Sequence, residues 1–104
     1  MNIIKTRQDT KLTIALEGRL DTITAPQLEA EIKSSLDGVT ELVLEFEKLE
    51  YLSSAGLRTV LAAQKLMSQH GKMVVRQVNE TIMEVFRVTG FTDFLTIEQE
   101  EDMP

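Results

Sequence analysis

Short apolar runs alternate along this chain with longer segments whose apolar residues recur at helical spacing, and this alternation constrains the fold most. The apolar runs predict strands at 3–7, 12–17, 42–46, 73–76 and 94–97, and the periodic segments predict helices that end near Gly38, Gly71 and Gly90. Strands that alternate with helices pack as a largely parallel sheet with right-handed crossovers. We therefore predict an α/β fold with a mixed, mostly parallel β-sheet and about three or four helices.

The first two predicted strands form an N-terminal hairpin around a short polar turn. Leu12, Ile14 and Leu16 alternate with other residues, which is the period of a strand with one buried face, and we expect Gly18 to end it. The run 42–46 is apolar at four of its five positions. Such a run predicts a central strand that is covered on both faces.

Polar residues mark where two of the helices begin. Thr24 is followed three residues later by Gln27, which is a capping-box pattern, and Pro26 suits a first helical turn. Asn79 is expected to cap the third helix. The expected packing positions are Leu57, Val60, Leu61, Gln64 and Met67 on the second helix, and Ile82, Val85 and Phe86 on the third.

Length and composition fit one domain that spans residues 1–104. The chain has 104 residues, of which 42% are hydrophobic, so it can bury a core of its own. Residues 98–104 are rich in acidic side chains, and we expect them to form a flexible tail.

Charge and cysteine content narrow the classes of function. The formal net charge is −6 and the basic residues are scattered, which argues against binding to nucleic acid or to an anionic membrane. The chain has no cysteine, so a disulfide framework and a thiolate metal site are excluded. No apolar run resembles a signal peptide or a spanning helix, so we expect a soluble cytoplasmic protein without direct membrane insertion.

Two adjacent serines, Ser53 and Ser54, lie where a loop is expected to turn into the second helix. Unpaired backbone N–H groups and the positive end of the helix dipole suit a capping hydroxyl there, and they suit a phosphate even better. A cap explains one hydroxyl. It does not explain two serines followed by Ala55 and Gly56, whose small size leaves the first turn open to a partner. From the residues alone, a cap and a phosphorylation site both stay open.

A serine hydrolase is the catalytic alternative for this segment, and two observations argue against it. The nucleophile elbow needs the pattern Gly-x-Ser-x-Gly, but Leu52 occupies the first glycine position before Ser54. The only histidine, His70, follows 16 residues after Ser54 along the same predicted helix. That spacing corresponds to about 24 Å, far beyond the reach of a hydrogen bond.

Metal and cofactor sites lack their usual patterns. The carboxylates show neither the spacing of a calcium-binding loop nor that of a helical zinc site. The five glycines are spread singly along the chain, whereas a phosphate-cradling loop needs several in one turn. We therefore expect no metal and no bound cofactor, and any ATP must be held by another protein.

Three segments resemble the STAS domains, a family named for sulfate transporters and anti-sigma factor antagonists. They are Gly18-Arg19-Leu20-Asp21 with the later Thr24-Ala25, then Leu52-Ser53-Ser54-Ala55-Gly56-Leu57, and last Thr89-Gly90-Phe91. The second segment is the most specific, and the likeness covers nearly the whole chain. Within the family, the chain looks most like the small bacterial anti-sigma factor antagonists, which implies a single STAS-like domain.

The resemblance implies a phosphorylation site at Ser54. Aligned on Gly56 and Leu57, the phosphorylated serine of the family falls on Ser54, and its preceding aspartate falls on Ser53, which is a departure. Ser53 is the alternative phosphoacceptor or a cap. Arg58 follows Ser54 by one helical turn and could pair with a phosphate there. The residues expected to bind a partner or to lie near the phosphate are Asp21, Thr24, Ser53, Ala55, Gly56 and Arg58.

The resemblance also implies partner switching without enzymatic activity in this chain. The unphosphorylated antagonist would bind an anti-sigma factor that is also a serine kinase, and this binding would free the sigma factor. The kinase would then phosphorylate Ser54 and the complex would separate, until a PP2C-like phosphatase reverses the change. The alternative is a constitutive STAS adaptor subunit of a lipid-transport or transporter assembly. The sequence leaves the oligomeric state open.

Overall fold

The structure is a computed structural model that describes residues 1–99. Its strands are β1 (Asn2–Gln8), β2 (Lys11–Leu20), β3 (Glu41–Leu52), β4 (Lys72–Arg76) and β5 (Ile97–Glu98), and its helices are α1 (Ala25–Ser35), α2 (Ser54–Met67), α3 (Glu80–Thr89) and the short 3-10 helix η1 (Phe91–Asp93). The strands form one sheet in the order β1-β2-β3-β4-β5, antiparallel for the first pair and parallel for the others. The predicted α/β fold with an N-terminal hairpin is confirmed.

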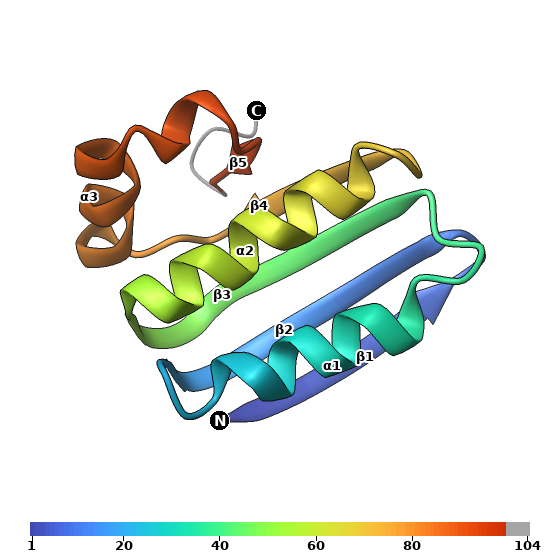
Figure 1. Cartoon of the computed structure of the whole chain (residues 1–104), viewed down its shortest axis with the longest axis horizontal. Helices are drawn as coiled ribbons and strands as arrows, with labels where there is room; N and C mark the ends of the chain where they lie inside the picture. The colour runs from blue at the N-terminus through green and yellow to red at the C-terminus, as the bar shows by residue number, and fades with distance from the viewer. Residues whose placement is uncertain (100–104) are drawn as a thin grey trace.

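Helices α1 and α2 lie side by side on one face of the sheet, and α3 lies beyond its β4 side (Figure 1). The core fills the space between this face and the helices. Its largest fully buried side chains include Ile14, Leu44, Phe46 and Phe86. The rings of Phe46 and Phe86 lie 6.5 Å apart and join α3 to the central strand.

The central run 42–46 is buried on both faces as predicted, but helices cover only one of them. Val43 is only 2% exposed on the face without helices, yet it is outside the core cluster, and α1 and α2 lie on the other side of the sheet (Figure 1). The physical reason is cross-strand pairing. Glu41 binds Lys72 at 3.9 Å and Glu45 binds Arg76 at 3.6 Å, and the stems of these long side chains flank Val43.

Strands β2 and β3 run further than the sequence patterns predicted. Gly18 does not end β2 but lies within it at a φ of 106°, next to a shift of register. β3 continues six residues beyond the predicted end at Phe46 to Leu52 because it remains paired with β2, up to Leu20 opposite Leu52. The two strands therefore end at the same level, which decides where the loops that follow them lie.

The helix ends are partly as predicted. The side chain of Asn79 caps α3 by accepting a hydrogen bond from the N–H of Ile82, and Gly90 ends α3 in the left-handed conformation. On α2, Leu61 and Gln64 are only partly buried, and the small residues Gly56, Thr59 and Ala63 are buried instead. On α3, Ile82 and Phe86 are buried and Val85 is partly buried.

The C-terminal segment also differs from the prediction. The strand expected at 94–97 is preceded by η1 and lies at Ile97–Glu98 as β5. The flexible tail was expected from Glu98, but Glu98 lies opposite Arg76 in the parallel pairing of β5 with β4. The side-chain amide of Gln99 also makes two hydrogen bonds of 2.8 Å with the backbone of Val78. The rest of the expected tail, residues 100–104, lies outside the described residues. Within residues 1–99, no helix is long and apolar enough to cross a membrane.

Candidate functional site

The ends of β2 and β3 bring two loops together at one edge of the sheet. The backbone N–H of Ser53 donates a hydrogen bond of 2.9 Å to the carbonyl oxygen of Leu20. Gly56 makes this approach possible, because a Cβ there would lie 2.7 Å from Leu20 Cγ, 2.8 Å from the Leu20 oxygen and 2.9 Å from Leu52 Cδ1. The first turn of α2 is thus packed directly against the strand end that leads to Asp21.

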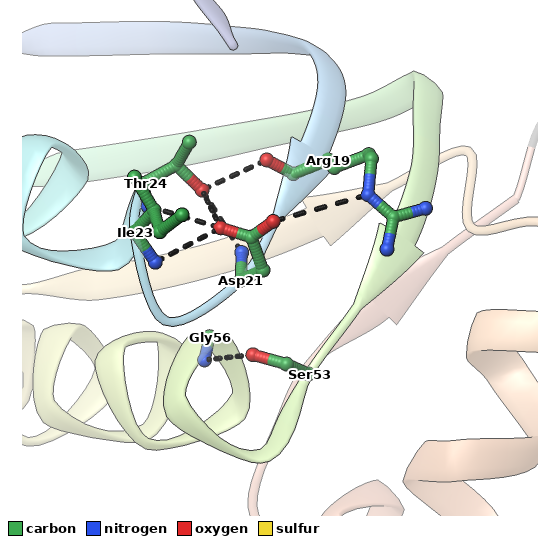
Figure 2. Close-up of polar contacts among 6 residues, drawn as sticks. All are labelled: Arg19, Asp21, Ile23, Thr24, Ser53 and Gly56. Atoms are coloured by element: carbon green, nitrogen blue, oxygen red, sulfur yellow. Dashed lines mark hydrogen bonds and ion pairs between the residues drawn. The ribbon is translucent and has the colours of Figure 1, made fainter.

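The two serines have different surroundings. Ser53 is the N-cap of α2: its backbone is extended and its Oγ accepts a hydrogen bond of 3.2 Å from the N–H of Gly56 (Figure 2). Ser54 is the first residue of α2 and is exposed, and its hydroxyl makes no hydrogen bond within residues 1–99. One hydroxyl is therefore used by the helix, and the other is accessible beside unpaired N–H groups.

Asp21 organises the loop that faces this helix start (Figure 2). Its Oδ1 accepts hydrogen bonds from the backbone N–H groups of Ile23 at 3.0 Å and Thr24 at 3.1 Å. Its Oδ2 lies 3.8 Å from Nε of Arg19. The hydrogen bond from the Thr24 N–H is the largest cause that holds the pKa of Asp21 below its ordinary value. Asp21 is therefore an anion at neutral pH, and its Oδ1 binds the backbone of its own loop.

Thr24 does not form the predicted capping box. It is the N-cap residue of α1 by position, but its side chain makes no cap hydrogen bond. Its Oγ1 accepts from the N–H of Asp21 at 2.9 Å and donates to the carbonyl oxygen of Arg19 at 2.8 Å. Thr24 thus closes the loop, because the Asp21 backbone and the end of β2 compete successfully for its hydroxyl.

Arg58 lies one turn after Ser54 and borders a shallow hollow of about 350 Å³ between α1 and α2. The hollow is lined by Thr22, Ala25, Pro26, Glu29, Ala55, Arg58, Thr59 and Ala62. Ala55 is half-buried there, so its small side chain leaves the hollow open. The expected site residues Asp21, Thr24, Ser53, Ala55, Gly56 and Arg58 all come from these two loops and the start of α2.

Two features of this surface were missed by sequence reasoning. The guanidinium carbon of Arg19 lies 4.1 Å from the ring centre of Tyr51, a contact that exists because β2 and β3 pair these residues. Ile23 is 86% exposed in the loop that Asp21 holds. An isoleucine within a polar loop was a signal that could have been used, whereas the contact of Arg19 with Tyr51 has no local signal.

The residues for hydrolytic or metal chemistry do not gather here. Ser54 begins α2, and His70 follows its last residue, Met67, so the length of the helix separates them. Within residues 1–99, no group of three or more His, Cys, Asp or Glu side chains is arranged to hold a metal ion. The arrangement can instead present an exposed hydroxyl at a helix start that is closely packed on β2.

Similar proteins carry the name of anti-sigma factor antagonists. BtrV of Bordetella bronchiseptica, named as an anti-sigma factor antagonist, is 34% identical over 99 residues, which cover 93% of this chain and 85% of BtrV. The anti-sigma-B factor antagonist of Staphylococcus aureus is 28% identical over 102 residues, which cover 95% of this chain and 94% of that protein.

The fold has solved counterparts. SpoIIAA of Bacillus, a cell fate determinant whose structure is known in the phosphorylated form, superposes with a TM-score of 0.74 at 23% identity, over 97% of this chain and 95% of SpoIIAA. A family model described as the STAS domain matches residues 2–103. The chain therefore belongs to the STAS domain family.

Proposed function

We propose that this protein is an anti-sigma factor antagonist whose partner binding is switched by phosphorylation of Ser54. The observation that carries the proposal is the unequal use of the two serines: Ser53 caps α2, whereas Ser54 is exposed and its hydroxyl is unbound within the described residues. Family membership and the names of the relatives support the same function.

The unphosphorylated protein would bind an anti-sigma factor that is also a serine kinase, and so release the sigma factor in the cytoplasm. In the kinase reaction, Ser54 Oγ loses its proton and attacks the γ-phosphorus of ATP, and ADP leaves. The kinase supplies ATP and its metal, so this chain needs no cofactor and performs no catalysis. A PP2C-like phosphatase would hydrolyse the phosphate and restore binding.

A phosphate on Ser54 is well placed to act as a switch. It would add about −1.5 to −2 charge at the helix start, where the dipole and free N–H groups stabilise an anion. The phosphate would lie at the surface formed by the Asp21 loop and the start of α2, a surface that also carries the exposed residues Ile23, Tyr51 and Arg58. An interface that fits the neutral serine would then have to bury a dianion for which the partner has no matching group, which is costly.

The test is to incubate the protein with the cognate kinase and ATP and to locate the phosphate by mass spectrometry. We expect phosphate on Ser54 in the wild type and in Ser53→Ala, and none in Ser54→Ala. Ser54→Asp should bind the kinase at least tenfold more weakly than Ser54→Ala. The absence of phosphate from both serines would contradict the proposal. A partner that binds Ser54→Asp as tightly as the wild type would instead indicate a constitutive adaptor.

A further inference from the structure

Arg58 differs from the other arginines of the chain. All five arginines lie in the described part of the chain, and four of them bind an oxygen atom: Arg7, Arg19, Arg76 and Arg87. Arg58 is exposed and has no hydrogen bond or ion pair within residues 1–99. An arginine without a partner is free to bind an anion that is absent from the unmodified protein.

The acidic groups of this site are already engaged. Glu29 lines the same hollow, but its Oε1 binds Lys33 at 2.8 Å. The Asp21 carboxylate accepts backbone hydrogen bonds from its own loop and faces Arg19. The site therefore contains a cation that its own carboxylates leave uncompensated.

The geometry of α2 places Arg58 on the same helix face as Ser54, because residues four apart share a face. Helical side chains tilt toward the N-terminus, so the first turn is within reach of Arg58, which lines the α1–α2 hollow together with Ala55 of that turn. An acidic group four residues before a basic one is the favourable order for a helical ion pair. An arginine within reach of a phosphate can bind two of its oxygens through the planar guanidinium fork.

We propose that Arg58 is the intramolecular ligand of the phosphate on Ser54. Phosphorylation then does two things at once: it adds a dianion to the surface and it withdraws the free guanidinium, which can no longer bind a carboxylate of a partner. This inference rests on the proposed function for its biological meaning. Whether Arg58 binds the phosphate can be tested without the kinase.

The experiment uses full-length protein with phosphoserine incorporated at position 54 during translation, and phosphorus NMR to follow the phosphate through its second ionisation near pH 6. A cation at the phosphate favours the dianion and lowers this pKa. In Arg58→Ala we expect the phosphate pKa to be higher than in the otherwise wild-type phosphoprotein by about 0.5 unit. Arg58→Lys should recover part of the difference, because a lysine keeps the charge but loses the two-pronged contact.

The matched control is Lys65→Ala, which removes an equal charge from the last turn of the same helix. We expect Lys65→Ala to leave the phosphate pKa unchanged. If Arg58→Ala and Lys65→Ala give the same phosphate pKa as the unsubstituted phosphoprotein, Arg58 does not bind the phosphate. That result would overturn this inference and leave the proposed function standing. If the kinase failed to modify Ser54, the proposed function would be overturned, while binding of the phosphate by Arg58 would stand.

Discussion

The two ends of the parallel strands are built alike but present different groups. At one end, Gly56 lets α2 pack against Leu20; at the other, Gly71 packs against the backbone of Thr40, whose carbonyl oxygen accepts a hydrogen bond from Lys72. At the Gly71 end, Arg7 closes loops by donating to the carbonyl oxygens of Asp37 and Asp9. At the Gly56 end, the hydroxyl of Ser54 and the guanidinium of Arg58 remain unbound within residues 1–99.

This difference separates the features that stabilise the fold from the features that indicate a binding site. Close glycine packing and backbone hydrogen bonds occur at both ends, so they stabilise the fold without indicating a site. What distinguishes the Ser54 end is that a hydroxyl and, one turn later, a guanidinium stand at the start of a helix, both unbound within the described residues. Such groups can gain a partner without first losing one, which is what a binding surface requires.

The largest expected effect lies at the end without a proposed site. In Gly71→Ala, the new Cβ would lie 1.9 Å from the carbonyl oxygen of Thr40, and the backbone φ of 158° would add strain. We expect a loss of about 3 kcal/mol or more in the free energy of unfolding, measured by urea denaturation. Gly90→Ala is the control: it also needs a positive φ, but nothing lies within 4 Å of its Cβ, so it should cost only about 1 kcal/mol.

Partner affinity per folded molecule should not change in Gly71→Ala. A weaker affinity at equal concentration of folded protein would show that the two ends are coupled. It would contradict the view that the Gly71 end serves stability alone.

Gly56→Ala should have the next largest effect. Its Cβ would press on both Leu20 and Leu52 in the core, and overpacking of this kind costs about 2 kcal/mol. The first turn of α2 must then move away from the Asp21 loop, so partner affinity should fall together with stability. Calorimetric titration with the partner measures the affinity. An unchanged affinity would mean that the spacing of these two loops does not matter for binding.

Ser53→Ala should have a smaller effect that separates the two serines. It removes the hydroxyl that accepts the Gly56 N–H, and loss of such a cap costs about 1 kcal/mol of unfolding free energy. Ser54→Ala should change stability by no more than a few tenths of a kcal/mol, because the Ser54 hydroxyl is unbound within the described residues. Ser53→Asp should retain the stability, since aspartate is also a good cap. Equal losses in the two alanine variants would contradict the assignment of Ser53 as the cap.

Asp21→Asn should give the smallest and the most pH-dependent effect. The Thr24 N–H holds the pKa of Asp21 in the folded protein below the 3.8 of an unperturbed aspartate. The ionised Asp21 therefore stabilises the fold fully when the pH is above its pKa in the unfolded protein. This stabilisation is lost as the pH falls through its pKa in the folded protein. The difference in unfolding free energy between the wild type and Asp21→Asn should be constant above about pH 5 and should shrink below about pH 4.

Arg19→Ala is the control for this pH dependence. The ion pair with Arg19 is the smallest of the causes that lower the pKa of Asp21, so this variant should retain most of the pH dependence. Loss of the dependence in Arg19→Ala would mean that the ion pair, and not the loop backbone, holds the carboxylate.

Features decided by neighbouring residues could be predicted from the sequence. Asn79 caps α3 and Gly90 ends it because both act on backbone groups no more than four residues away. The order of strands and helices followed from periodicity, which is local as well. The capping box at Thr24 was a wrong prediction because its hydroxyl binds the backbone of Asp21 and Arg19, which precede it, whereas the capping pattern considers only the residues that follow.

The sequence by itself determined that two hydroxyls stand at the start of a helix, followed by small residues and, one turn later, by an arginine. The tertiary structure decided their surroundings. Only the continued pairing of β2 with β3 places Leu20 against Ser53 and brings the Asp21 loop to the first turn of α2. The physical reason is that a cap needs only its own helix, whereas an exposed serine becomes a candidate switch through the surface that distant strands assemble around it.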